Sequence, residues 1–280
     1  MGGFPMGGGK MAGGGLGILG LIIAVLFGGN VLGGGGGGGG FGIDPGTGGF
    51  GTTPGESARG LDEAPDPDAQ LAEFVTFVVE DVQASWQDQF ATAGQQYQVT
   101  TLVLFEDGVQ TGGCGSATSA TGPFYCPADS KVYLDLGFFR DLSSRFGAPG
   151  DFAQAYVIAH EFGHHVQNVL GVNEQVRRAQ QRNPDDANEL SVRLELQADC
   201  LAGVWGHSAY QDNLLEEGDL EEGLTAASAV GDDRIQQAAT GRIDPESFTH
   251  GSAEQRRSWF LVGFQEGDPA ACNTFTADQL

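Results

Sequence analysis

A glycine-rich leader limits how much of this 280-residue chain can build a hydrophobic core. Most of its 47 glycines precede residue 68, including the uninterrupted run 33–40. Glycine adds no side chain to a core and loses more conformational freedom on ordering than any other residue. We therefore expect a disordered tail over 1–15, a flexible Gly/Pro-rich linker over 33–67, and one folded domain over 68–280 that is long enough for a substantial core.

One apolar stretch, residues 16–32, interrupts this leader and is at the short end of what spans a bilayer. The nearest basic residues are Lys10 before it and Arg59 well after it, which places the N-terminus in the cytoplasm by the positive-inside rule. A cleaved secretory signal is the alternative, but no A-x-A site follows the stretch. The sequence predicts a single-pass segment in the cell membrane and an extracytoplasmic domain.

Acidic residues dominate the charge, with 37 Asp+Glu against 13 Lys+Arg and a net charge of −24. A surface of this sign repels the phosphate backbone, so we expect no nucleic-acid partner. The acidity otherwise indicates a solvated surface and says little about chemistry.

Four cysteines are consistent with an oxidising compartment outside the cytoplasm. Of the three possible pairings we favour Cys114–Cys126, which flank a short Gly/Ser-rich loop, and Cys200–Cys272. These would stabilise the fold by about 3 and about 4 kcal/mol, the longer loop gaining more. A zinc site built from the cysteines is the alternative, but no C-x-x-C spacing supports it.

The pattern of apolar residues predicts an α+β fold that is mostly helical, with a small sheet. Alternating or β-branched apolar runs predict strands at 97–105 and 131–136, and Asp151 is a candidate N-cap for a long helix over 152–170. Helical spacing or length predicts further helices at about 69–91, 138–146, 188–212, 218–230, 232–240 and 252–266. The strand 131–136 precedes the long helix and is a candidate template for binding an extended substrate, if it lies at a sheet edge.

The run His160-Glu161-Phe162-Gly163-His164 carries the most chemical information. Two histidines four residues apart project from one face of a helix, so both imidazoles can bind one metal ion. The glutamate beside the first histidine can reach a water at that ion without binding the metal. Incidental histidines on a surface helix are the alternative, but the preceding turns are apolar, as a buried active-site helix requires.

A catalytic zinc usually has three protein ligands and one open position. Glu195 and Asp199 are again four apart on an expected helix, among apolar neighbours that make an unpaired charge costly. We assign Glu195 as the third ligand and Asp199 as the acceptor of the free N–H of a ligating histidine, His160. A solvated acidic pair is the alternative.

This set of ligands would make zinc acidic enough to activate water at neutral pH. Glu161 would then be the general base, and a further donor would stabilise the oxyanion that develops. His250, which precedes a helix, is our candidate for that donor, against an ordinary polar role in a turn; Tyr156 is a weaker candidate. His165 points about 100° away from the ligand face and is left out, and His207 is expected to be structural.

Several long motifs resemble the neutral zinc metallopeptidases of bacteria, over about residues 72–276. They are GPFYCPAD with KVYLDLGFF, FGAPGDFAQAYVIAHEFGHHVQ, RLELQADCLAGVW, GDDRIQ, THGSAEQR, WFLVGF and GDPAAC. The resemblance implies a zincin-like fold, zinc ligation by His160 and His164, and a catalytic Glu161. Glu195 and Asp199 are similar to the E-x-x-x-D pattern of zincins with a glutamate ligand, and an N-terminal membrane segment is typical of the family.

The leading hypothesis is a membrane-anchored, extracytoplasmic zinc metallopeptidase acting on protein or peptide substrates. The alternatives are a zincin-fold metal-binding regulatory protein without turnover, and a zinc amidase acting on cell-wall peptides. An intact Glu161 argues against the first alternative, because metal binding alone does not require it. The amidase would share the chemistry and differ in the shape of its cleft.

Overall fold

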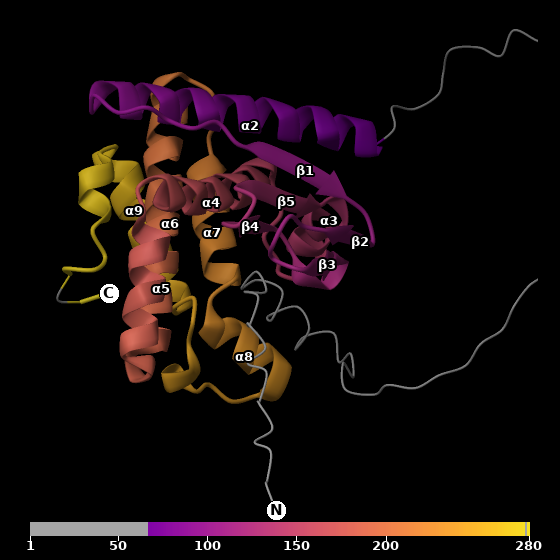
Figure 1. Ribbon diagram of the computed structural model, residues 1–280. Helices are drawn as coiled ribbons and strands as arrows, with labels where there is room; N and C mark the ends of the chain where they lie inside the picture. The colour runs from indigo at the N-terminus through magenta and orange to yellow at the C-terminus, as the bar shows by residue number, and fades with distance from the viewer. Residues whose placement is uncertain (1–66, 278) are drawn as a thin grey trace, which may run out of the picture.

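The computed structural model describes residues 67–277 and 279–280, and these form the fold shown in Figure 1. The leader segments expected at 1–15, 16–32 and 33–67 lie outside these residues, apart from residue 67 itself. Among the helices that the structure describes, none combines the length and the apolar character that crossing a membrane requires.

A long helix is followed by five short strands in the first half of the described chain, and helices make up the rest. The helices are α2 (Pro67–Thr92), α3 (Leu136–Ser144), α4 (Asp151–Val169), α5 (Val172–Arg182), α6 (Ala187–Gln211), α7 (Asp219–Ala229), α8 (Asp232–Thr240) and α9 (Ala253–Glu266). The strands are β1 (Thr101–Phe105), β2 (Gly108–Gln110), β3 (Ser116–Thr118), β4 (Phe124–Cys126) and β5 (Lys131–Asp135). Short 3-10 turns lie at Ser119–Thr121, Pro184–Asp186, Pro245–Ser247 and Pro269–Cys272.

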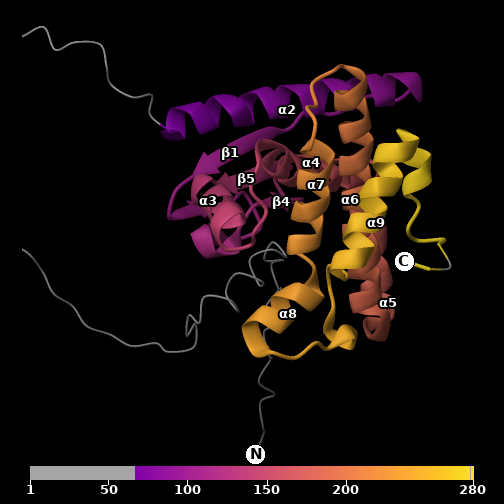
Figure 2. The same cartoon turned by 180° about the vertical axis from the view of Figure 1, so that it is seen from behind.

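Helix α4 is central to this arrangement. The strands and α3 lie to one side of it, whereas α6, α7 and α9 lie to the other (Figures 1 and 2). Helix α2 crosses above both groups and packs against α4 and α6. Most residues of α4 are buried, so its polar side chains lie inside the protein, where they need partners. The expected α+β class, mostly helical with a small sheet, is confirmed.

The main sheet has three strands in the order β1-β5-β4. Strand β5 pairs in parallel with β1, with Val103 opposite Tyr133, and antiparallel with β4, with Tyr125 opposite Val132. Both sides of β5 are therefore hydrogen-bonded within the sheet. The hypothesis that the strand 131–136 offers a free edge to substrate is wrong, because β1 and β4 are the edge strands.

Two glycine contacts set how closely the helices approach. Gly163 of α4 faces α6, where an added Cβ would lie 2.9 Å from the Ala198 carbonyl oxygen. Gly263 of α9 also faces α6, and its Cβ would lie only 1.8 Å from the Cys200 carbonyl oxygen. A side chain at either position would push α6 away. The two glycines therefore allow α6 to pack close to both α4 and α9.

Both expected disulfides, Cys114–Cys126 and Cys200–Cys272, are present, and none of the four cysteines is free. The first joins the loop between β2 and β3 to the last residue of β4. The second ties α6 to the 3-10 turn after α9. A zinc site built from cysteines is thereby excluded.

Three features of the elements differ from the sequence-based expectation. Helix α5 was not expected, nor were the short strands β2, β3 and β4. The long helix α4 begins at Asp151 itself, and Gly150 is its N-cap residue. Asp151 was expected at the cap, but its carboxylate accepts a hydrogen bond from the Phe152 amide at 2.8 Å in the first turn.

Candidate metal centre

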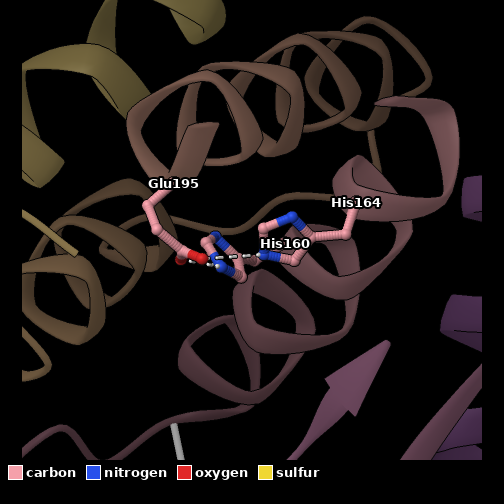
Figure 3. A group of neighbouring side chains, drawn as sticks. All are labelled: His160, His164 and Glu195. Atoms are coloured by element: carbon pink, nitrogen blue, oxygen red, sulfur yellow. Dashed lines mark ion pairs between the residues drawn. The ribbon is translucent and has the colours of Figure 1, made fainter. Parts of the chain in front are cut away.

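Helices α4 and α6 bring together the three side chains expected to bind metal. His160 and His164 project from one face of α4, and Glu195 reaches them from α6 (Figure 3). The close approach of the two helices at Gly163 shortens the span that the Glu195 side chain must cover. His160 and Glu195 are almost fully buried, whereas the side chain of His164 is 14% exposed, so the centre is open to solvent on the His164 side.

The spacing of these atoms fits a metal ion. His160 Nε2 lies 3.2 Å from Glu195 Oε2, and His164 Nε2 lies 3.4 Å from Glu195 Oε1. One ligand atom from each residue lies within 4.8 Å of the other two. Two ligand atoms at the tetrahedral angle, with metal bonds of about 2.0–2.1 Å, are about 3.3 Å apart. His160 Nε2 is also buried without a hydrogen-bond partner, as expected for an atom whose natural partner is an ion.

The electrostatics of the centre favour a cation. Burial opposes a charged imidazolium at His160, but the nearby carboxylates of Asp199 and Glu195 outweigh it and raise the pKa to about 9. Burial opposes the charge at His164 too, yet Glu195 raises that pKa. At Glu195 burial favours protonation, but His164 and His160 lower the pKa well below its usual value. The carboxylates thus attract positive charge to the point between the imidazoles.

A buried hydrogen-bond network contacts His160 at Nδ1, on the side of the ring opposite Glu195. Its Nδ1 lies 2.8 Å from Asp199 Oδ1, which is the contact expected from the sequence. Asp199 also accepts from the Tyr156 hydroxyl at 2.5 Å and from two Arg256 nitrogens at 2.8 and 2.9 Å. Tyr156 was a weaker candidate for the oxyanion donor, but its hydroxyl is engaged by Asp199, so the structure gives it a supporting position.

His164 is held by a different acceptor. Its Nδ1 lies 2.8 Å from Gln167 Oε1, one turn further along α4. Gln167 is fully buried, and its amide nitrogen donates to the Leu194 carbonyl oxygen of α6 at 2.7 Å. Both histidines therefore turn Nε2 towards Glu195 and Nδ1 towards an oxygen acceptor.

Glu161 lies next to His160 on α4 and is 2% exposed. Burial raises the pKa of Glu161, against the lowering influence of His160 and His164. A raised carboxyl pKa brings a group closer to the range in which it exchanges protons near neutral pH. Glu161 is therefore a buried carboxyl group that lies close enough to His160, His164 and Glu195 for their charges to influence its pKa.

His250 lies beside Glu195, in the turn before α9. The adjacent Gly251, with φ of 92°, packs on α6 so that a Cβ there would lie 3.1 Å from Leu196 and 3.4 Å from Val192. The charge of His250 contributes to the low pKa of Glu195, where burial and the histidine ligands are the larger influences. His250 is 2% exposed, and its Nε2 is buried without a hydrogen-bond partner. Its Nδ1 lies 2.8 Å from Asp232 Oδ1, so the ring is fixed from one side and has Nε2 available on the other.

The two histidines left out of the centre have structural partners. His165 packs between Tyr97 and Tyr125, with Nδ1 3.0 Å from the Tyr125 hydroxyl and Nε2 2.5 Å from the Gln98 carbonyl oxygen. His207 contacts the Phe264 carbonyl oxygen at 2.8 Å through Nδ1. Neither belongs to the cluster of His160, His164 and Glu195.

Sequence reasoning missed three residues that orient this centre: Gln167, Asp232 and Arg256. Arg256 was the strongest available signal, because it is a cation within an otherwise acidic protein and stands on the same face of an expected helix as apolar Phe260. No spacing rule joins Asp232 to His250, since Asp232 begins α8 and His250 lies beyond both α8 and the 3-10 turn that follows it. Gln167 follows the motif by one turn, and a buried glutamine leaves no distinctive pattern.

Comparison with known proteins places the chain in a family. The model of a family described as "Putative neutral zinc metallopeptidase" matches residues 1–275. The uncharacterized protein YpfJ of Escherichia coli K12 is 54% identical over 207 residues, which are 74% of this chain and 72% of that protein. The uncharacterized protein Rv2575 of Mycobacterium tuberculosis H37Rv is 52% identical over 189 residues, 63% of this chain and 62% of that protein. No solved structure matches the chain. The chain therefore belongs to this neutral zinc metallopeptidase family.

Proposed function

We propose that this chain is a zincin-like zinc peptidase that hydrolyses peptide bonds with a water molecule. The observation that carries the proposal is the convergence of His160, His164 and Glu195, with Glu161 buried at the same point of α4. Two neutral imidazoles and one carboxylate are a donor set that suits zinc, and three protein ligands leave a fourth position for solvent. The family description supports the same reaction class.

When bound, zinc supplies a Lewis acid that lowers the pKa of water and polarises a carbonyl oxygen. The side chains around it would transfer protons and stabilise the negative charge that develops on the substrate oxygen. Glu161 accepts a proton from the attacking water and returns it to the departing amine, a role for which a buried carboxylate with a raised pKa is suited. Because Glu161 is not needed to hold the ion, its presence supports turnover over simple metal binding.

His250 serves in this proposal as the donor to the oxyanion. Asp232 faces Nδ1 and also accepts from the backbone amides of Thr249 and His250, so the ring is clamped in one orientation. With Nδ1–H donating to Asp232, Nε2–H of an imidazolium can donate to a substrate oxygen. A donor fixed before the reaction begins stabilises the transition state without a cost for reorganisation.

We further propose that residues 16–32 anchor the protein in the cell membrane with its peptidase domain outside the cytoplasm. The two disulfides support an oxidising compartment, and Lys10 supports a cytoplasmic N-terminus. Proteolysis of spheroplasts with an external protease is the test. Degradation of the domain only after the membrane is opened would contradict this orientation.

The catalytic proposal is tested with the full-length chain and its Glu161→Gln variant. Glutamine keeps the shape of the side chain but cannot accept the proton. We expect one zinc per chain in both proteins, measured by elemental mass spectrometry. Cleavage of a peptide library should fall by about 10²–10⁴-fold in the variant.

The exposed Glu217 provides a matched control, because Glu217→Gln makes the same chemical change far from the centre. It should cleave at the wild-type rate. Equal cleavage by wild type and Glu161→Gln would contradict the proposed role of Glu161. Cleavage of cell-wall peptides alone, with no protein or library peptide attacked, would show an amidase instead of a peptidase.

A further inference from the structure

His164 can bind a metal through Nε2 only if its neutral ring carries its proton on Nδ1. A proton on Nδ1 needs an acceptor, and the neighbouring atom is Gln167 Oε1 at 2.8 Å. A glutamine amide offers an oxygen or an NH₂ group depending on which way it is turned. If the amide were reversed, its NH₂ would face Nδ1 and favour the tautomer that cannot bind the ion through Nε2. The orientation of this one amide therefore decides the chemistry of the ligand.

Backbone carbonyls fix the orientation of the Gln167 amide, because a carbonyl oxygen can only accept a hydrogen bond. Gln167 Nε2 lies 2.7 Å from the Leu194 carbonyl oxygen and 3.1 Å from Gln197 Oε1. Gln197 Nε2 in turn lies 2.9 Å from the Cys272 carbonyl oxygen. Each amide directs its NH₂ group towards a carbonyl oxygen on the side away from His164. The oxygen of Gln197 therefore faces Gln167, and the oxygen of Gln167 faces His164. We call His164, Gln167, Gln197 and the Cys272 carbonyl the glutamine relay.

A disulfide holds the far end of the relay. Cys272 is bonded to Cys200 of α6, and both residues are buried, with exposures of 1% and 0%. Cys200 follows Asp199, which accepts from His160 Nδ1 at 2.8 Å. At Cys200, α6 is also pressed against α9 through Gly263. The disulfide is thus connected to both histidines. Cys200 adjoins Asp199, which contacts His160, and the carbonyl of Cys272 ends the relay that contacts His164.

We propose that Gln167, Gln197 and the Cys200–Cys272 disulfide are positioning elements for the metal ligand His164, and that they fix its Nδ1–H tautomer. This inference rests on the proposed zinc centre. The relay runs from the Cys272 carbonyl through the amides of Gln197 and Gln167 to the His164 imidazole. Because the oxygen of Gln167 faces Nδ1, the ring proton lies on Nδ1 and the Nε2 lone pair is free for the ion. Because the disulfide is buried, it keeps the Cys272 carbonyl in place at the end of the relay.

The test is the zinc affinity of the full-length protein, measured by competition with a chromogenic chelator at pH 7. Methionine replaces each glutamine, since it has a similar length and cannot make these hydrogen bonds. Loss of a hydrogen bond behind a metal-binding histidine typically weakens affinity about 10–100-fold. We expect Gln167→Met to lie in that range, and Gln197→Met to lose affinity by a smaller factor of at least about threefold.

Two matched controls separate the relay from general packing. Gln180 bridges α5 and α6 through the Ala187 carbonyl at 3.0 Å and Ser191 at 2.9 Å, away from the metal centre. Gln180→Met should keep wild-type zinc affinity. The double variant Cys200→Ala/Cys272→Ala should lose affinity as Gln197→Met does, whereas Cys114→Ala/Cys126→Ala should not. If the first double variant fails to fold, Gln197→Met carries the test alone.

A second readout distinguishes positioning from stability. A purely structural role lowers the melting temperature equally with and without zinc, whereas a weaker site reduces the rise that zinc causes. The relay is supported if Gln167→Met and Gln197→Met shrink the zinc-induced rise and Gln180→Met does not. It is overturned if wild type binds zinc and both relay variants bind it within about twofold of wild type. Absence of zinc binding by the wild type would instead overturn the proposed function itself.

Discussion

Each histidine of the metal centre turns Nδ1 towards an oxygen, Asp199 Oδ1 for His160 and Gln167 Oε1 for His164. These acceptors fix where the ring protons lie, so both Nε2 atoms face Glu195. Holding ligands by hydrogen bonds from behind is a general feature of metal sites. Here the two acceptors differ in charge, because one is an ionised carboxylate paired with Arg256 and the other is a neutral amide.

At Arg256 we predict a large loss of stability on substitution by methionine. Its guanidinium is 1% exposed and forms two hydrogen bonds with Asp199. Removing one partner of a buried pair leaves the other charge uncompensated, which costs about 3–5 kcal/mol. The free energy of unfolding in urea measures the loss. The neighbouring Arg257 faces Glu221 at the surface and provides the control: Arg257→Met should change stability little, and equal losses for the two variants would contradict the account.

The sequence predicted which side chains converge, His160, His164 and Glu195, because local spacing carries the information. Residues four apart on a helix share a face, so both the His160–His164 pair and the Glu195–Asp199 pair could be read directly. Arg256 and Gln167 could not, since a role in positioning depends on contacts between helices whose packing no spacing rule gives. The place of His250 before a helix makes it a candidate in the sequence, whereas its contact with Asp232 depends on packing and cannot be predicted from spacing.

At the level of elements, close helix contacts through glycine bring the ligands within reach. We predict that Gly263→Ala will destabilise the protein by at least about 3 kcal/mol, at the upper end of the usual cost of overpacking. The added methyl would meet the backbone of α6, which cannot move aside independently. Gly206→Ala is the control, because its methyl would meet the Phe264 ring at 3.2 Å, a side chain that can shift. Thermal unfolding of both variants checks this, and a smaller loss at Gly263 than at Gly206 would refute it.

The contact between α2 and α6 includes the titratable group of Asp81. Trp205 donates to Asp81 at 2.7 Å, and burial raises the pKa of Asp81, with a further increase from Asp212 that the tryptophan hydrogen bond partly offsets. A raised pKa in the folded state stabilises the fold at pH below the unfolded value of about 3.9, and this contribution is lost as the pH rises through the folded value. Asp81→Asn keeps an acceptor without the charge.

We therefore predict that Asp81→Asn gains stability relative to wild type as the pH rises from the unfolded pKa of about 3.9 through the raised folded pKa of Asp81. Urea unfolding at several pH values measures the difference. Asp88→Asn, an exposed change on the same helix, should show no comparable trend. A difference for Asp81→Asn that stays constant or falls with rising pH would be inconsistent with this assignment.

The longer helices were predicted to within a few residues, because apolar periodicity extends over several turns in each. Helix α5 was missed since its sequence, VNEQVRRAQQR, has only two strongly apolar residues and buries one of them, Val176. Strands of three residues are too short for alternation to be recognised. The central place of β5 could not be read from its own pattern, because the order of strands depends on pairing with distant segments.

For the whole molecule, a metal ion held by His160, His164 and Glu195 would crosslink α4 and α6. We predict that a chelator lowers the melting temperature of the zinc-loaded protein and that added zinc restores it. A ligand present at 100 times its Kd stabilises the fold by about 2.7 kcal/mol. Glu195→Gln is the control, since loss of the carboxylate should abolish the response to the chelator. An equal response in wild type and variant would place the stabilising ion elsewhere.

We propose that His160, His164 and Glu195 bind one zinc ion. A crystal structure of the zinc-loaded protein, with diffraction recorded on both sides of the zinc absorption edge, tests it most directly. We expect one anomalous peak at about 2.0–2.2 Å from Nε2 of both histidines and from a Glu195 oxygen. A peak at other residues, or zinc-loaded protein with the Glu195 carboxylate turned away from both imidazoles, would contradict it.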